Sequence, residues 1–293
     1  MAKNLSEKYA HSKSTTLAFG FGAMTDQMSH QAFQFLVFTF YYAVVGVNIK
    51  VIAAAFIIFA IWDSINDPII GALSDKTRSK FGRRRFWVLV SLLPFAAINF
   101  LLFTPPQYSA TGKAVYMVII IMLYDLFYSV FSTNQTSLFP EMFPTERQRG
   151  RANLLKNLMM IIGLLIGFVL PTLFISPLAP TESTPSDVVA KIPSMYRTTG
   201  LVLAILVLIF GFLFFQFGMK EPDQPPQDEK ATLSMLESLK ITLKNKTFII
   251  FVVANLFVWF TFKMLTTIIN LYGIHVLGIG EGDFFLTILL LAA

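Results

Sequence analysis

Seven long apolar segments, followed by the start of an eighth, dominate this sequence of 293 residues. Each of the seven is long enough to cross a bilayer, since a helix needs about 20 mostly apolar residues to span roughly 30 Å of hydrocarbon. Because a helix satisfies its own backbone hydrogen bonds, the sequence predicts an all-α polytopic membrane protein. The predicted spans are 17–46, 51–73, 86–104, 115–138, 154–175, 198–218 and 248–272, and the eighth begins near Phe284.

The composition agrees with a membrane protein and excludes several other classes. Hydrophobic residues make up 55% of the chain and charged residues 14%, whereas an ordinary soluble domain has about 25% charged residues. So few charges cannot coat a soluble enzyme, and a disordered chain or a collagen-like repeat is excluded as well. The chain has no cysteine, so it forms neither disulfides nor zinc–thiolate sites.

Basic side chains mark one side of the predicted membrane. Most of the 23 lysines and arginines fall in alternate segments, at 1–16, 74–85, 139–156 and 219–246. By the positive-inside rule, these segments and the N-terminus are expected to be cytoplasmic, in a multi-pass protein of the cell membrane. The net charge of +6 then follows from topology, and no nucleic-acid partner is predicted.

The longest connection, 219–246, divides the chain into three predicted parts. A six-helix bundle occupies 1–218, a cytoplasmic middle loop 219–246, and the start of a second bundle 247–293. In the loop, residues 232–244 have the pattern of a short amphipathic helix on the membrane surface, and a plain linker explains them equally well. Since Ala293 lies ten residues into the eighth segment, we expect the chain to be truncated within that helix.

Two carboxylates in the second span form the sharpest candidate site. Asp63 and Asp67 are four residues apart and Asn66 is three from Asp63, so all three share one helix face. Carboxylates this close in a low dielectric require a bound proton or a cation between them. Hard oxygen ligands suit Na⁺, so the pattern predicts a cation site without a transition metal. The alternative is that each acid only pairs with a basic residue, such as Lys263, and holds helices together.

Polar stripes in the first and fourth spans predict a water-filled substrate cavity, with interhelical hydrogen bonding as the alternative. Lys263, in the middle of the seventh span, is expected to balance the carboxylates across this cavity or to extend toward an interface. The stripes contain Asp26, His30 and Gln34 in the first span and Asp125, Ser129, Ser132, Thr133 and Thr136 in the fourth.

Four motifs give the chain a family likeness. They are DSINDPIIG at 63–71, DKTRSKFG at 75–82, FGFGA at 19–23 and SLFPEMFPTER at 137–147. Together they resemble the glycoside–pentoside–hexuronide (GPH):cation symporters, the melibiose-permease family of the major facilitator superfamily (MFS). The likeness is good over the first five spans and looser beyond them.

The resemblance implies a twelve-helix transporter of two bundles with alternating access. It implies that Asp63 and Asp67, with Asn66 beside them, bind Na⁺, H⁺ or Li⁺. The family's sugar ligands come from helices one, four and five, and here the match is incomplete. The positions that align with its two acids, its stacking tryptophan and its basic residue hold Gln27, Ser132, Thr136 and Lys156. The resemblance therefore implies that the cation site is retained and that the galactoside site is not.

The connection after the second span carries the general facilitator signature. A single carboxylate among six basic residues is expected to form gating salt bridges to neighbouring helix ends, although the arginines fix topology in any case. The residues of this gating loop are Gly71, Asp75, Arg78, Gly82, Arg83 and Arg84.

Three functions follow from these patterns. The first is symport of a sugar or glycoside coupled to Na⁺ or H⁺, with the coupling ion as the only cofactor and the lipid bilayer and a small-molecule substrate as partners. The second keeps the fold and moves a lysophospholipid or another amphiphile, which the 31 phenylalanines favour. The third is a membrane enzyme or scaffold. No nucleophile–base pair, phosphate loop or metal-ligand cluster stands out, so the chain is not predicted to be an enzyme.

Overall fold

The computed structural model describes residues 12–106, 109–180, 184–221 and 241–275. The chain divides into two compact units, Met1–Pro225 and Pro226–Ala293, and the boundary falls inside the connection at 219–246. In the second unit the structure describes one long helix, α9 (Lys246–His275). The predicted eighth span and most of the predicted helix at 232–244 lie outside the described residues.

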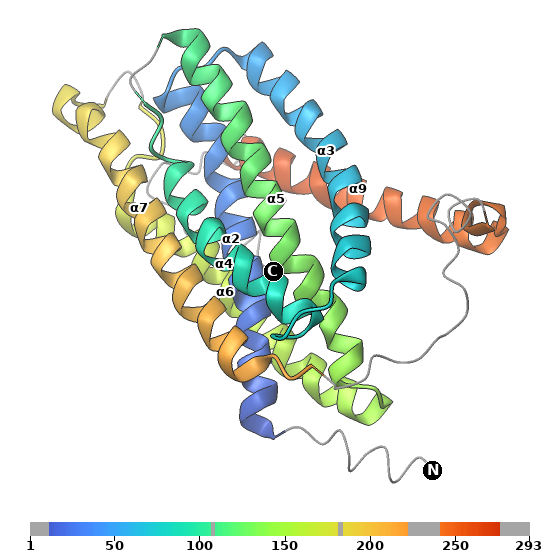
Figure 1. Cartoon of the computed structure of the whole chain (residues 1–293). Coiled ribbons are helices and arrows are strands. Elements are labelled where there is room, and N and C mark those ends of the chain that lie inside the picture. Colours follow the sequence, from blue (N-terminus) through green and yellow to red (C-terminus); the bar gives the residue numbers. More distant parts are fainter. Residues whose placement is uncertain (1–11, 107–108, 181–183, 222–240, 276–293) are drawn as a thin grey trace. The chain divides into compact units, whose positions relative to one another are not determined.

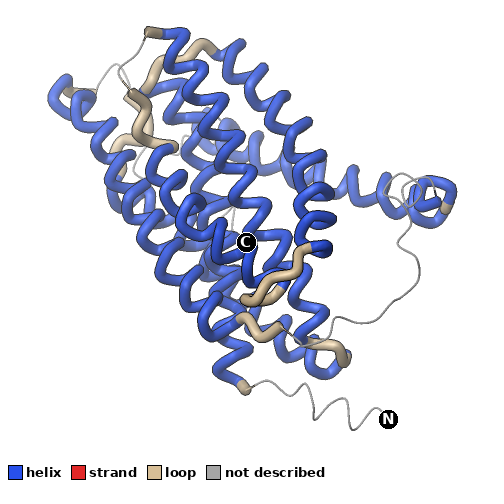
Figure 2. Tube along the Cα trace, in the orientation of Figure 1, coloured by secondary structure: helices blue, strands red, loops and turns tan. Residues whose placement is uncertain are grey.

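The first unit is a bundle of membrane-length helices (Figure 1). Every predicted span from the first to the sixth corresponds to one helix, and the described part of the chain is helix joined by short loops (Figure 2). The prediction of an all-α fold is therefore confirmed. The helices are α2 (Lys13–Thr39) continued by η1 (Phe40–Val44), α3 (Ile49–Lys76), α4 (Arg83–Leu101), α5 (Ala110–Met142), α6 (Glu146–Phe174), and α7 (Ser186–Leu213) continued by η2 (Phe214–Gly218).

Five helices in the described residues are long and apolar enough to cross a membrane: α3, α4, α5, α6 and α7 with η2. α2 is also long, at 27 residues. It falls outside this set because polar residues recur along it, among them Asp26, Gln27, His30 and Gln34. A helix of this length with polar side chains is tolerated in a membrane where those side chains face protein or a polar cavity.

Several helices extend beyond the predicted apolar segments because polar caps define their ends. α6 begins at Glu146, well before the apolar run at 154. Thr145 accepts a hydrogen bond from the backbone of Gln148, and the Gln148 side chain accepts one from the backbone of Thr145. This capping box satisfies two backbone N–H groups that the helix leaves free. Ser109 caps α5 in the same way by accepting a hydrogen bond from the backbone of Gly112.

Close contact between α2 and α6 depends on two glycines. A Cβ atom on Gly167 would lie 2.7 Å from the backbone oxygen of Met28, and one on Gly163 would collide with the backbone of Met24. Gly163 and Gly167 form a G-x-x-x-G pair, a spacing that lets helix backbones approach closely in membranes. This contact positions α2, and with it Asp26, against the rest of the bundle.

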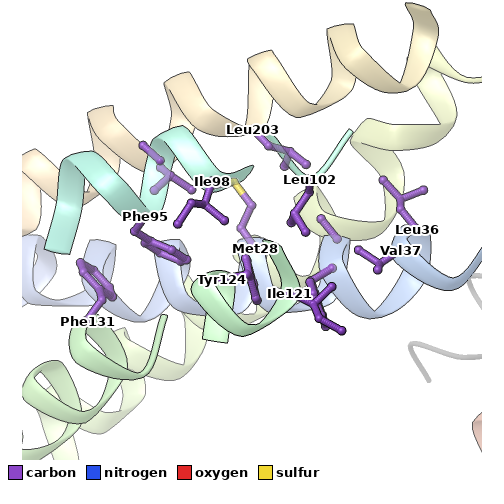
Figure 3. Packing of buried hydrophobic residues seen from close by; sticks show 14 of the residues in the cluster. Met28, Leu36, Val37, Phe95, Ile98, Leu102, Ile121, Tyr124, Phe131 and Leu203 are labelled. Carbon is purple, nitrogen blue, oxygen red and sulfur yellow. The ribbon is translucent and has the colours of Figure 1, made fainter. Parts of the chain in front are cut away.

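The core lies among α2, α4, α5 and α7 (Figure 3). Met28, Phe95, Tyr124 and Leu203 each contribute a side chain that is no more than 1% exposed. α3 differs, since a row of its apolar residues is exposed, as expected for a helix that meets lipid or a neighbouring bundle. That row contains Ile57, Ile61, Ile65, Ile69 and Leu73.

Candidate functional site

A buried polar contact joins α3 to α5. The side-chain Nδ2 of Asn66 donates a hydrogen bond to Oδ2 of Asp125 at 3.1 Å. Asn66 is 4% exposed and Asp125 is 1% exposed. A buried carboxylate is costly without such donors, so the position of α3 against α5 is tied to this pair.

Asp63 and Asp67 lie on the same face of α3 as Asn66. Asp63 is half-buried, and its carboxyl group interacts directly with that of Asp125. Asp67 is exposed and adds negative charge to both. The structure therefore adds a third carboxylate, Asp125, to Asp63 and Asp67, the two that the sequence of the second span predicted. Among the described residues, no three His, Asp or Glu side chains are arranged to hold a metal ion.

Asp26 forms a second polar group, built from α2, α5 and α6. Its carboxyl group interacts with the side chains of Ser132 and Tyr128 on α5, and with the charge of Lys156 on α6. Its Oδ1 atom is buried and has no hydrogen-bond partner in the described part of the chain. Asp67 also contributes to the field at Asp26. The two groups are thus electrostatically connected, and four helices supply them.

His30 extends the second group along α2. Its Nε2 atom lies 2.5 Å from Nε2 of Gln34, and its Nδ1 atom lies 3.3 Å from the hydroxyl of Tyr128. The rings of His30 and Tyr128 are 5.2 Å apart between centroids. Tyr128 therefore interacts with two of the polar residues that the first span contributes, Asp26 and His30. Sequence reasoning did not select Tyr128, although it lies three residues from Asp125 and four from Ser132, on a neighbouring part of the same helix face.

The remaining predicted cavity residues have different surroundings. Ser129 is buried, and its hydroxyl has no hydrogen-bond partner among the described residues. Thr133 faces Gly71, where an added Cβ atom would make ordinary contact at 3.9 Å. Thr136 is exposed and its hydroxyl donates to the side chain of Gln135 at 3.3 Å. Gln27 and Lys156 are half-buried, the latter with its ammonium 5.0 Å from the ring centre of Phe139. Lys263 lies in α9, but its side chain is outside the described residues.

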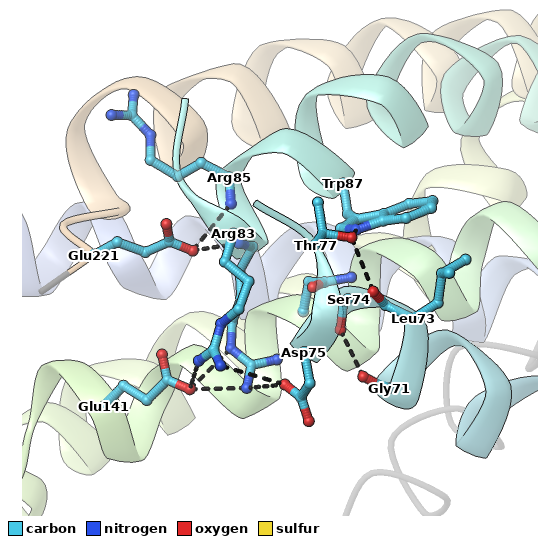
Figure 4. Close-up of polar contacts among 12 residues, drawn as sticks. Gly71, Leu73, Ser74, Asp75, Thr77, Arg83, Arg85, Trp87, Glu141 and Glu221 are labelled. Carbon is cyan, nitrogen blue, oxygen red and sulfur yellow. Dashed lines mark hydrogen bonds and ion pairs between the residues drawn. The ribbon is translucent and has the colours of Figure 1, made fainter. Parts of the chain in front are cut away.

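A salt-bridge cluster forms where α3 ends, α4 begins and α5 ends (Figure 4). The Nη2 atom of Arg84 lies 3.0 Å from Oδ1 of Asp75 and 2.8 Å from Oε1 of Glu141. Arg83 Nη2 donates to the same Oε1 atom at 2.7 Å. The predicted gating loop therefore does form salt bridges to a neighbouring helix end. The acid that receives them, Glu141, was missed, although it is a carboxylate at the end of a span beside basic residues.

Glu221, just after η2, fixes the start of α4. Its carboxylate accepts hydrogen bonds from the backbone N–H groups of Arg84 and Arg85. Gly82, which precedes this helix, has a φ of 102°, in the region that favours glycine, and provides no side-chain cap. A carboxylate is stabilised at a helix N-terminus by the free N–H groups and by the helix dipole. Arg78 is exposed in the same connection.

Comparison with known proteins agrees with this architecture. Residues 18–293 match the family described as MFS/sugar transport protein. An uncharacterized symporter, sll1374, of Synechocystis is 30% identical over 83% of this chain and 44% of its own length. The isoprimeverose transporter of Lactiplantibacillus pentosus is 24% identical over 75% of this chain and 44% of its own. The sodium-dependent lysophosphatidylcholine symporter 1-A of Danio rerio is 23% identical over 90% and 54%.

The chain thus spans about half the length of these curated relatives. The family match extends over both units. A protein of Escherichia coli whose name is "Putative glycoside/cation symporter YagG" is 31% identical over 39% of this chain and 25% of its own length. Together with the membrane-length helices, these matches identify a multi-pass membrane protein. The chain belongs to the MFS/sugar transport family of the major facilitator superfamily and is related to its glycoside/cation symporters.

Proposed function

We propose that the chain is part of a cation-coupled symporter that carries a sugar or glycoside. The observation that carries the proposal is the meeting of Asp63, Asn66 and Asp125 between α3 and α5. Carboxylates gathered at membrane depth need a compensating positive charge, and a monovalent cation or a proton supplies it. In this proposal the coupling ion binds at Asp63, Asn66 and Asp67, with Asp125 as a neighbour that tunes the site.

The substrate would bind beside the ion, at the group formed by Asp26, His30 and Tyr128. Carboxylate, imidazole and phenol groups are suitable hydrogen-bond partners for sugar hydroxyls. The negative charge of Asp67 acts on the carboxyl group of Asp26. Binding of a cation at the ion site therefore changes the electrostatic energy of the Asp26 carboxylate at the substrate site. Such coupling is reciprocal: the factor by which the ion changes substrate affinity equals the factor by which the substrate changes ion affinity.

The salt bridges of Asp75 and Glu141 with Arg83 and Arg84 would hold one gate closed. Such a gate opens when these ion pairs break. The free energy needed to break them would come from tighter binding of ion and substrate to the open state. We place this end of the bundle and the N-terminus in the cytoplasm of a cell, because the basic residues gather there.

A lysophospholipid is the second candidate substrate. It is favoured by the similarity of 90% of the chain to a protein named as a sodium-dependent lysophosphatidylcholine symporter. The isoprimeverose transporter, by its name, favours a sugar over a comparable share of the chain. Competition between the two ligands for the same purified protein separates these candidates.

Thermal unfolding of the purified chain in detergent tests the ion site. We expect a higher melting temperature in NaCl than in choline chloride at equal ionic strength, because a ligand stabilises the state that it binds. Asp63→Asn and Asp67→Asn should both abolish the difference. Asp187→Asn is the matched control, since this carboxylate is 70% exposed and pairs with Lys191 four residues away.

Three outcomes are informative. A sodium-specific rise that only the α3 variants lose supports a Na⁺ site, and binding of isoprimeverose and lysophosphatidylcholine is then measured in Na⁺ and in choline. A rise that appears only on lowering the pH, and that the same variants lose, supports coupling to H⁺. If neither condition distinguishes the α3 variants from Asp187→Asn, the acids are structural and the proposal is wrong.

A further inference from the structure

A pocket of about 790 Å³ lies at the end of the bundle where α3 ends and α4 begins. Its walls come from the connection at 77–82, the first turn of α4, the end of α5 and the residues that follow η2, all within the first unit. This volume falls in the range of about 300–1,000 Å³ that is usual for ligand sites. The ion and substrate groups described above do not line it.

The acidic side chains of this pocket are already engaged. Asp75 and Glu141 share the guanidinium groups of Arg83 and Arg84. Glu221 is bound by two backbone N–H groups at the start of α4. These three carboxylates are therefore engaged, and none of them forms an ion pair with Arg78, Lys80, Arg85 or Lys220 in the part of the chain that the structure describes.

Those remaining basic residues leave the pocket positively charged. Arg78, Lys80 and Lys220 are exposed, line the pocket, and form no ion pair within the part of the chain that the structure describes. Arg85 also lines it, and its guanidinium lies 4.8 Å from the ring centre of Phe215 and donates to the backbone oxygen of Phe215 at 3.4 Å. A concave surface with unneutralised charge of one sign attracts a ligand of the opposite sign.

We propose that this pocket binds the phosphate group of an anionic phospholipid. Arginine and lysine side chains donate charge-assisted hydrogen bonds to phosphate oxygens, and the guanidinium group does so through two parallel N–H donors. The hydroxyl of Ser79 adds a donor, since its oxygen already accepts a hydrogen bond from the backbone of Phe81 at 3.2 Å. The wall thus offers several donors to one tetrahedral anion.

The surroundings of the pocket favour a lipid over a phosphate ion from solution. The pocket lies at the ends of membrane-length helices, where headgroups are found, and basic residues at that level attract anionic lipids. Phe81, in the wall, is 61% exposed. Ile69 and Leu73, in the last turns of α3, are 52% and 49% exposed. An exposed aromatic side chain and an apolar helix face beside a basic pocket suit acyl chains beside a headgroup.

The test measures thermal unfolding of the purified chain in detergent micelles that contain phosphatidylglycerol or phosphatidylcholine. We expect phosphatidylglycerol to raise the melting temperature by about 2–4 °C relative to phosphatidylcholine, as for a ligand that binds the folded state. Arg78→Gln with Lys80→Gln should abolish the rise. Arg147→Gln with Arg151→Gln is the matched control, because it removes two exposed positive charges from residues that do not line the pocket.

A parallel series with sodium phosphate against sodium chloride at equal ionic strength identifies the source of the phosphate group. A rise with phosphatidylglycerol alone, lost only in the Arg78 and Lys80 variant, supports the proposal. A rise with free phosphate and none with the lipid overturns the lipid assignment and assigns the pocket to a soluble anion. Equal losses in the two double variants mean diffuse surface attraction, and no rise with either probe means no anion site; both results overturn the proposal.

Discussion

The amide of Asn66 and the carboxylate of Asp125 are joined by a buried hydrogen bond of 3.1 Å between α3 and α5. This bond connects α3, which carries the proposed ion ligands, with α5, which carries Tyr128 of the proposed substrate group. A bound ion that attracts the oxygen of Asn66 acts on Asp125 through the same side chain. The pair therefore gives the proposed coupling between ion and substrate a direct physical route.

Replacing Asn66 tests how much this contact stabilises the bundle. Asn66→Ala leaves the buried carboxylate of Asp125 without its amide donor, so we expect a loss of about 1–3 kcal/mol in the free energy of unfolding. Asn153→Ala, at an exposed position of α6, is the control and should change stability little. Unfolding in mixed detergent micelles measures both. Equal effects of the two variants would show that the buried bond contributes nothing.

The salt-bridge cluster predicts an unequal cost for its two acids. The side chains of Arg84 and Glu141 are 7% and 12% exposed, whereas that of Asp75 is 55% exposed. Glu141→Ala leaves a buried guanidinium without its main partner, which costs about 3–5 kcal/mol. Asp75→Ala removes a solvent-exposed partner and should cost at most about 1 kcal/mol. Unfolding midpoints of the two variants measure these losses, and a larger loss for Asp75→Ala than for Glu141→Ala would contradict the structure.

Tyr124 provides a test of the polar contacts inside the core. Its hydroxyl lies 3.0 Å from that of Ser29, which in turn donates to Asn99 at 2.8 Å. Tyr124→Phe removes one hydrogen bond at a side chain that is 1% exposed, so we expect a loss of about 0.5–1.5 kcal/mol. Tyr42→Phe is the matched control, because Tyr42 is 51% exposed. A loss of similar size in the control would assign the effect to something other than the buried bond.

Sequence alone predicted the helices because apolar length is a strong constraint in a membrane. It misplaced their ends, since the cap at Thr145 and Gln148 is polar and lies outside the apolar segment. It found Asp63, Asn66 and Asp67 together because they share one helix face. It assigned Asp125 to the substrate cavity alone, because its contact with Asn66 depends on how α3 packs against α5, and spacing along one helix does not contain that information.

The same limit applies to residues that the sequence left unselected. Glu141 and Glu221 meet Arg83, Arg84 and Arg85 only after α4, α5 and α7 pack together. The G-x-x-x-G spacing of Gly163 and Gly167 is visible in the sequence, but its partner helix is not. Local patterns therefore identified the helices and one polar face, while the contacts between helices required the structure.

The glycines of α6 give the sharpest test of helix packing, because the chain contains an internal control. Gly167→Ala places a Cβ atom 2.7 Å from the backbone oxygen of Met28, and a backbone atom cannot move aside as a flexible side chain does. We expect this variant to separate α2 from α6 and to lose about 1–3 kcal/mol of stability. Gly150 lies in the same helix with no atom within 4 Å of an added Cβ. There, Gly150→Ala should gain about 1 kcal/mol, since alanine is the better helix former. The free energies of unfolding of both variants are measured under one condition. A gain in stability at both positions would mean that α2 and α6 do not meet at Gly167.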